Sequence, residues 1–311
     1  MAGGEVCFRV VGQSAARVDA PTRPDVGLSS AKECCFSLPA LVNPSNTNEL
    51  ENDKHSLLFR YDKDYYTDVV FTLQKQESGV WVDKTIINGN LGAFYDLGQY
   101  SNDKYNYIGT EVEWVNVFLL YSDGNYRFKI EETDFSASVT EYIYPFEFCV
   151  KEYTPNRANN SVRFDFYQKA IIGDWQVDTE TFDYSPMNQP NGWYNELRLP
   201  SYFGQNTSTY EREFIKYQNG NLNYIQDEQI ENFNWVSGYF PAQLHQFIKT
   251  NVLQADTIQV TDFNKNNPNV ISKKEVKPNS SYEPDWKFKK QTAKVNVEFV
   301  EAYQLKRKRR C

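Results

Sequence analysis

The chain has 311 residues, of which 40% are hydrophobic and 16% aromatic, and its formal net charge is −8. An acidic chain is poorly suited to bind nucleic acid or an anionic membrane surface. No stretch is apolar enough for a signal peptide or a membrane-spanning helix. We therefore expect no membrane insertion and no sequence-specific nucleic-acid binding.

The five cysteines lack the paired spacing of a zinc site. We expect reduced thiols, including the adjacent Cys34 and Cys35, and no metal or other cofactor. This cysteine usage is typical of a protein that is assembled in the cytoplasm.

Residues 1–50 are rich in Ala, Gly, Ser and Pro, and their two aromatic residues are Phe8 and Phe36. Val6, Phe8 and Val10 alternate as in one short strand, and four prolines then interrupt the segment. So long an irregular stretch is unusual inside a compact domain. We therefore predict an extended N-terminal arm that becomes ordered on a neighbouring subunit.

Residues 51–170 alternate apolar and polar residues at period two, which is typical of antiparallel strands with one buried face. Turns are expected at Ser78-Gly79 and at Asp123-Gly124, where glycine permits the positive φ of a tight hairpin. Strands are expected at 69–73, 80–82, 112–119, 126–130, 142–150 and 162–166. Their spacing predicts a β-sandwich domain.

Residues 171–206 are crowded with Pro, Asn, Asp and Gly, and we predict a long loop or connection there. Residues 207–305 form a second β module in this interpretation, with a hairpin at Asn219-Gly220, strands at 258–260 and 295–299, and an extended loop at 264–286. Its one helix covers 241–253, begins with Pro241 and has an apolar face at the i, i+3, i+4, i+8 spacing, made by Leu244, Phe247, Ile248 and Val252. Residues 306–311 form a basic C-terminal tail, expected to be solvated.

Residues that could carry chemistry are few. His55 lies in a charged stretch and is expected to be solvated, and His245 is expected to be half-buried on the helix, so neither predicts a catalytic or metal site. Five carboxylates lie near aromatic residues in one region: Asp174, Asp178, Glu180, Asp183 and Glu196. Because glycoside hydrolysis needs only two carboxylates, a glycoside hydrolase stays open as a hypothesis. We nevertheless predict a protein that is not an enzyme. Trp193 and Tyr194 could stack on sugar rings.

These elements predict a mainly β fold, an antiparallel β-sandwich followed by a second β-sandwich or split barrel with one flanking α-helix. The order of the second module is a hairpin through 217–220, Trp235, the helix from Pro241 to Ile248, and strands at 256–260 and 295–299. This order resembles the tail-tube and distal-tail proteins of tailed bacteriophages. The Asn- and Tyr-rich composition is similar to that of virion proteins of phages that infect Bacteroidota.

The resemblance implies a ring-forming structural subunit of a phage tail or baseplate, located in the virion and assembled in the host cytoplasm. It also implies that the partners are further copies of the chain and other tail proteins. The N-terminal arm, the long loops and an assembly helix with the face Leu244, Phe247, Ile248 and Val252 would make the contacts. The alternative is a carbohydrate-binding β-sandwich that recognises host surface glycans through Trp193 and Tyr194.

Overall fold

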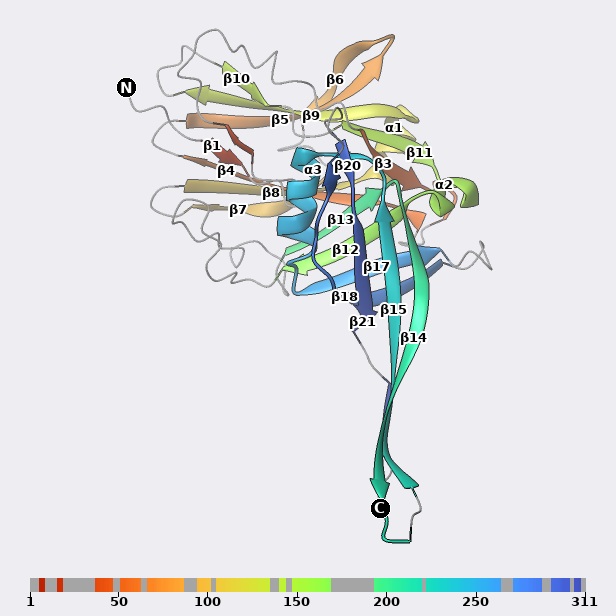
Figure 1. The fold of residues 1–311 in the computed structure, drawn as a ribbon. Coiled ribbons are helices and arrows are strands. Elements are labelled where there is room, and N and C mark those ends of the chain that lie inside the picture. Colours follow the sequence, from red (N-terminus) through yellow and green to blue (C-terminus); the bar gives the residue numbers. More distant parts are fainter. Residues whose placement is uncertain are drawn as a thin grey trace.

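The computed structural model describes residues 6–8, 16–18, 37–46, 51–62, 66–86, 94–101, 105–134, 140–143, 147–168, 193–219, 222–263, 271–286, 292–302 and 305–308. The protein is mainly β, which confirms the predicted fold class. Sheets from the two halves of the chain form a body, from which one long hairpin projects (Figure 1).

The first half is a sandwich of two sheets. The larger sheet has the strand order β3 (Ser37–Val42), β11 (Glu147–Glu152), β9 (Gly124–Asp134), β5 (Tyr66–Glu77) and β6 (Val80–Ile86), with β10 (Thr140–Ile143) also on β9. The smaller sheet has the order β4 (Lys54–Asp62), β8 (Tyr105–Glu113) and β7 (Phe94–Ser101). Aromatic side chains fill the space between them, so that the ring of Phe148 lies 4.8 Å from those of both His55 and Trp114. Period-two alternation therefore buries one face of these strands, as predicted.

Residues 1–50 are not one extended arm. β3 belongs to the body and pairs in parallel with β11, and its Leu38, Ala40 and Val42 are buried. Farther upstream, β1 (Val6–Phe8) and β2 (Ala16–Val18) pair antiparallel with each other. Pro39 is tolerated because β3 is an edge strand. The prediction was wrong because β3 pairs with a strand far along the chain, which a local pattern does not reveal.

Residues 114–121 form helix α1 (Trp114–Tyr121), where the sequence predicted an apolar strand. Trp114, Val117, Phe118 and Tyr121 follow the i, i+3, i+4, i+7 spacing, and all four pack on the core. The helix ends at Ser122, which has a φ of 67°. The Asp123-Gly124 turn therefore joins a helix to β9 and is not a hairpin. The Ser78-Gly79 turn does join β5 to β6, with φ values of 52° and 83°, as predicted.

The second half is built on an eight-stranded sheet. Its order is β13 (Trp193–Leu199), β12 (Val162–Gln168), β17 (Thr257–Phe263), β18 (Ile271–Pro278), β21 (Asn296–Glu301), β15 (Leu222–Ser237) and β14 (Ser201–Lys216), with β22 (Leu305–Lys308) also on β15. The short helix α2 (Pro155–Asn159) precedes this sheet. A small sheet of β16 (Phe240–Pro241), β20 (Thr292–Lys294) and β19 (Asp285–Trp286) lies beside it.

The sheet pairing moves several predicted boundaries. β12 pairs with β13 and β17, so residues 162–168 belong to the second sheet and do not close the sandwich. The predicted connection over 171–206 contains β13 and the start of β14 from residue 193 onward, and its earlier residues lie outside the described part. The predicted loop over 264–286 contains β18. The strand predicted over 142–150 is divided between the end of β10 and β11. These boundaries were predicted from local residue types. Pairing between distant strands overrides the weak structural propensity of such local stretches.

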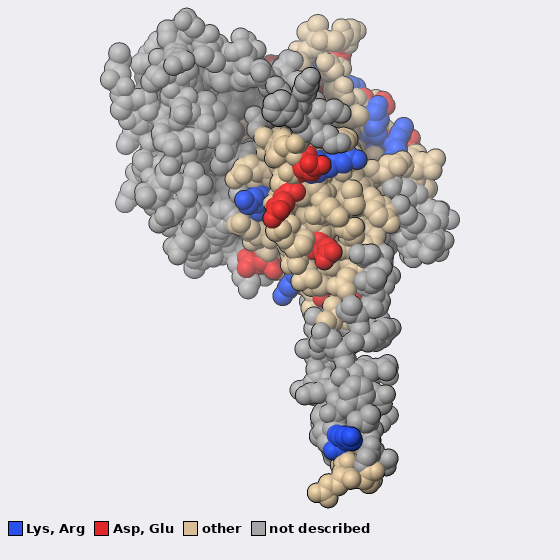
Figure 2. Space-filling model, in the orientation of Figure 1, with Lys and Arg blue, Asp and Glu red and all other residues tan. Residues whose placement is uncertain are grey.

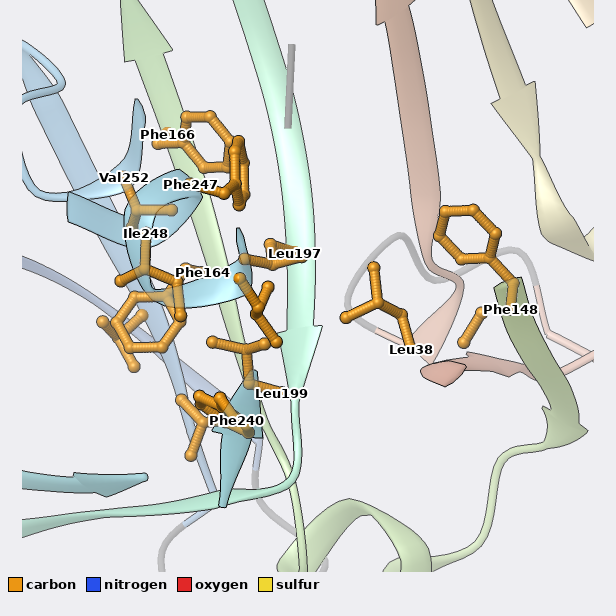
Figure 3. Close-up of a cluster of buried hydrophobic side chains, with 14 of the residues drawn as sticks. Leu38, Phe148, Phe164, Phe166, Leu197, Leu199, Phe240, Phe247, Ile248 and Val252 are labelled. Atoms are coloured by element: carbon orange, nitrogen blue, oxygen red, sulfur yellow. The ribbon is translucent and has the colours of Figure 1, made fainter. Parts of the chain in front are cut away.

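The helix predicted over 241–253 is present as α3 (Ala242–Phe247) continued by one π-helical turn, η3 (Ile248–Val252). Its apolar face lies against the eight-stranded sheet, where Phe247, Ile248 and Val252 meet Phe164 and Phe166 (Figure 3). Each of the four predicted assembly residues is at most 1% exposed, including Leu244. They therefore belong to the core of this chain, which corrects their interpretation as an assembly surface.

Candidate functional site

A cluster of buried charged side chains lies where the sandwich meets the eight-stranded sheet. Asp53 immediately precedes β4, whereas Arg163 and Asp165 come from β12 and Glu196 and Arg198 from β13. All five residues are at most 5% exposed. We call them the ionic junction. Charged groups are seldom buried so deeply unless they are paired with one another.

The register of β12 and β13 places like charges opposite each other. Arg163 lies opposite Arg198, and Asp165 lies opposite Glu196, while Phe164 and Leu197, on the other face of the two strands, lie in the core. Like charges directly across a strand pair destabilise a sheet. The second sheet therefore requires compensating charge. Arg163 receives it from Asp165 and Glu196 of the same sheet as well as from the sandwich, and Arg198 receives it from the sandwich.

Asp53 supplies that charge. Arg198 donates from Nε to Asp53 Oδ2 at 2.6 Å and from Nη2 to Oδ1 at 2.8 Å, and Arg163 Nη1 donates to Oδ1 at 3.3 Å. The backbone N–H of Leu41 in β3 donates to Oδ2 at 2.7 Å. Burial alone would raise the pKa of Asp53, but both arginines and these hydrogen bonds lower it below its usual value. Asp53 is therefore an ionised link between the two halves of the protein.

Asp165 is held by cations on two strands. Its Oδ1 lies 2.9 Å from Arg163 Nε, and its Oδ2 lies 2.7 Å from Nζ of Lys273 in β18. Burial would lower the pKa of Arg163, but Glu196, Asp165 and Asp53 raise it above its usual value. The guanidinium therefore stays charged at the centre of the junction.

Glu196 is the carboxylate of the junction that faces both Lys54 and Tyr194. It accepts a hydrogen bond from the backbone N–H of Lys54 at 2.8 Å and another from the Tyr194 hydroxyl. Burial raises the pKa of Glu196 to about 7; Arg163 acts in the opposite direction, and Asp165 adds to the increase. This carboxyl group is therefore the member of the junction that gains or loses a proton near neutral pH.

His55 is buried, which corrects its expected exposure to solvent. It is 2% exposed, and its Nδ1 lies 3.3 Å from the backbone oxygen of Glu196, so Nδ1 carries the proton and donates it. Among the described residues, Nε2 has no hydrogen-bond partner. Burial lowers the pKa of His55 to about 4, against the effect of the bond to Glu196.

A small cavity lies beside the junction and is lined by Asp53, His55, Trp114, Phe148 and Glu196 among others. Its volume of about 10 Å³, measured for the centre of a water-sized sphere, is room for about one water molecule. An organic substrate does not fit there. The chemistry of this site is therefore ionic cross-linking of the two halves, in which each carboxylate faces donors from more than one strand.

Of the predicted sugar-stacking pair, the structure describes the side chain of Tyr194, whereas that of Trp193 lies outside the described part. The Tyr194 ring packs on Tyr167 with centroids 4.7 Å apart, and its hydroxyl is bound to Glu196. Burial raises the pKa of Tyr194, as does the Glu196 charge. Of the five carboxylates near these aromatic residues, Glu196 lies in the junction, and the other four lie outside the described residues.

His245 is also buried, at 3% exposure, where the sequence predicted a half-buried position. Its Nε2 lies 3.0 Å from the Ala293 backbone oxygen and therefore donates, so Nδ1 accepts from the Tyr282 hydroxyl at 2.6 Å. Burial lowers the pKa of His245. Both ring nitrogens are occupied in fixing the segment around Tyr282 on α3.

The far ends of β14 and β15 form a second distinctive region. Their hairpin was predicted from Asn219-Gly220, and each strand has 16 residues. Ten register pairs run from Thr207–Asn232 to Lys216–Leu222, which is roughly 30 Å of strand. Figure 1 shows this part standing clear of the body. We call residues 207–219 and 222–232, together with β22, the β-arm.

Residues 305–308 of the basic C-terminal segment form β22 in the β-arm, and residues 309–311 lie outside the described part. β22 pairs antiparallel with β15, and Lys306 lies opposite Glu228 while Arg307 lies opposite Asp227. Opposite charges directly across two strands stabilise their pairing. Acidic and basic side chains are also interspersed over the face of the body in Figure 2, with no patch of a single sign among its described residues.

In the part of the chain that the structure describes, no three His, Cys, Asp or Glu side chains are grouped so that they could hold a metal ion. None of the described helices has the length and apolar character needed to cross a membrane. Neither the protein-family models nor the curated proteins contain a match to this chain.

The sequence did carry a signal for the ionic junction. Arg163 and Asp165, and likewise Glu196 and Arg198, are separated by one apolar residue within strands that are apolar on their other face. Charges at period two inside a strand indicate a charged face. The sequence did not indicate that Asp53 would neutralise charge on that face, because Asp53 is more than 100 residues away.

Proposed function

We propose that this protein is a non-enzymatic structural subunit that assembles with further copies of itself through the β-arm. The observation that carries the proposal is the projection of the paired strands away from the body. Ordering a residue costs roughly 1–2 kcal/mol of backbone entropy, and a two-stranded ribbon in water recovers little of that cost. A neighbouring subunit supplies the burial that the arm lacks within its own chain.

The buried ionic junction supports the same proposal. A subunit that binds its neighbour through a projecting arm must keep its two halves in a fixed relative position. Asp53 binds both Arg163 and Arg198 across the boundary between them. Removing one partner of such a buried pair costs about 3–5 kcal/mol, so the halves resist separation.

The assembly that we propose is a ring in the tail or baseplate of a bacteriophage, made in the host cytoplasm and carried in the virion. This part rests on the order of hairpin, helix and strands that resembles tail-tube and distal-tail proteins. The partners in this proposal are further copies of the chain and other tail proteins.

The test is the mass of the purified protein in solution by light scattering, compared with a variant in which Asn-Gly replaces residues 209–230. The replacement closes the Ser208–Glu231 register pair with a two-residue turn. We expect a defined oligomer for the natural chain, visible as rings by electron microscopy, and a folded monomer of about 34 kDa for the shortened variant. The core residues all remain in the variant, so its circular dichroism and thermal unfolding should resemble those of the natural chain.

A natural chain that stays monomeric over a wide range of concentration contradicts self-assembly. An oligomer that is unchanged in the shortened variant contradicts the role of the β-arm. An oligomer without closed rings contradicts the tail assignment but not the role of the arm.

A further inference from the structure

The most exposed large hydrophobic residues of the described chain include two neighbours on α1. Leu119 is 64% exposed and Leu120 is 62% exposed. They lie on the face of the helix opposite Trp114 and Val117, which are buried in the core. We call Leu119 and Leu120 the α1 patch. Contiguous exposed apolar surface marks contact sites, and these two leucines adjoin each other on an ordered helix.

The β-arm gains apolar and aromatic residue types on both sides of its polar turn, whereas its shaft is charged. Along the shaft, Glu211 and Arg212 lie in register with Glu228 and Asp227. Toward the turn the residue types change, and Phe214 lies opposite Tyr224 while Lys216 lies opposite Leu222. Tyr217 follows at the turn and is 46% exposed. A charged shaft that ends in apolar and aromatic residues suits docking by the tip.

The two apolar surfaces lie at opposite ends of the molecule. Figure 1 shows α1 at the top of the body and the turn of the hairpin at the far end of the projecting arm. The tip therefore does not reach the α1 patch of its own chain. A second copy brings both surfaces, and the arm extends roughly 30 Å of paired strand toward it.

We propose that the tip of the β-arm docks on the α1 patch of a second copy of this chain. The contact is head-to-tail, because the two surfaces differ, so each subunit donates one tip and accepts another. Such a heterologous contact closes into a ring when the rotation per subunit allows it. This inference rests on the proposed function and adds the two surfaces that meet.

The test uses two complementary variants. The patch variant, Leu119→Glu with Leu120→Lys, keeps helix-forming residues and the net charge. The tip variant, Tyr217→Ser with Leu222→Thr, keeps the hairpin turn. We expect each variant alone to remain at the monomer mass of 36.3 kDa. An equimolar mixture should give a species of twice that mass and nothing larger, because only one tip and one patch remain intact.

The outcomes separate this inference from the proposed function. A natural chain that is monomeric overturns both. A different outcome is that the natural chain forms oligomers and that the patch variant or the tip variant forms oligomers of the same mass. That result overturns only the docking of the tip on the patch, because another surface then makes the contact. A mixture that stays monomeric overturns the head-to-tail arrangement. Asp123→Asn, close to α1 in sequence, serves as the control and should leave the natural mass unchanged.

Discussion

The ionic junction and the β-arm both bring together opposite charges from separate segments of the chain, yet the surroundings differ. In the junction the charges are at most 5% exposed and come from segments that are far apart in the chain. In the arm, Lys306 and Arg307 pair in register with acidic residues of a ribbon that stands clear of the body. The same residue types therefore carry very different weight in stability, because water and salt screen exposed charges.

The difference also separates two roles. The junction fixes the two halves of one subunit, and its ion pairs form within one chain. The arm contributes little to the fold of its own subunit. Substitutions in the junction should therefore change unfolding, whereas substitutions in the arm should change local opening and assembly.

The largest effect is expected for Asp53→Asn. The substitution removes the anion that faces Arg163 and Arg198 and leaves two buried like charges in register. The free energy of unfolding should fall by about 3–5 kcal/mol, measured by urea denaturation at neutral pH. Asp123→Asn is the matched control, because the Asp123 side chain is 58% exposed where it meets Lys151 and its loss should cost at most about 1 kcal/mol. Equal effects of the two substitutions would contradict the distinction between the regions.

The next effect concerns His55, whose pKa is about 4 in the folded protein and 6.5 as its reference value. Its contribution to stability is present above pH 6.5 and is lost as the pH falls toward 4, because the unfolded chain binds a proton that the folded protein rejects. The loss amounts to about 3 kcal/mol over this range. His55→Gln should remove it, so the stability difference between variant and natural chain should change with pH over this window. Parallel curves would show that His55 does not titrate as expected.

Glu196 should act in the opposite direction. Its pKa rises from 4.5 to about 7 in the folded protein, so its contribution is fully present below pH 4.5 and is lost as the pH rises through 7. The loss is at most about 3 kcal/mol. Glu196→Gln should abolish this alkaline decline, and the acid decline caused by His55 should then stand out between pH 4.5 and 6.5, where the two slopes oppose each other in the natural chain. A variant curve that still falls from pH 4.5 to 7 would contradict this assignment.

The smallest effect is expected in the β-arm. Lys306→Glu with Arg307→Glu places like charges opposite Glu228 and Asp227. Such cross-strand pairs are worth roughly 0.2–1 kcal/mol each, so global unfolding should hardly change. Amide hydrogen exchange of residues 226–229 should instead become several-fold faster. Lys306→Arg with Arg307→Lys keeps the charges and should leave exchange unaltered. A large fall in global stability would place β22 in the core of the fold.

Local pattern predicted the elements whose cause is local. The period-two run at Tyr126, Phe128 and Ile130 became β9, and the apolar spacing from Leu244 to Val252 became α3 and η3. The stretch from Trp114 to Tyr121 fits both the period of a strand and the period of a helix, because nearly all of its residues are apolar. The helix was chosen by packing, since it buries Trp114 and Val117 while leaving Leu119 and Leu120 outside.

The sequence by itself determined the mainly β class, the Ser78-Gly79 turn and the hairpin of β14 and β15, because turn chemistry and side-chain alternation act over a few residues. The tertiary structure alone decided that β3 belongs to the core, that β12 joins the second sheet, and that Asp53 meets Arg163 and Arg198. These contacts join residues up to 145 positions apart. Burial of the charges is tolerated only when all partners are present, and no local pattern records which distant residue will be the partner.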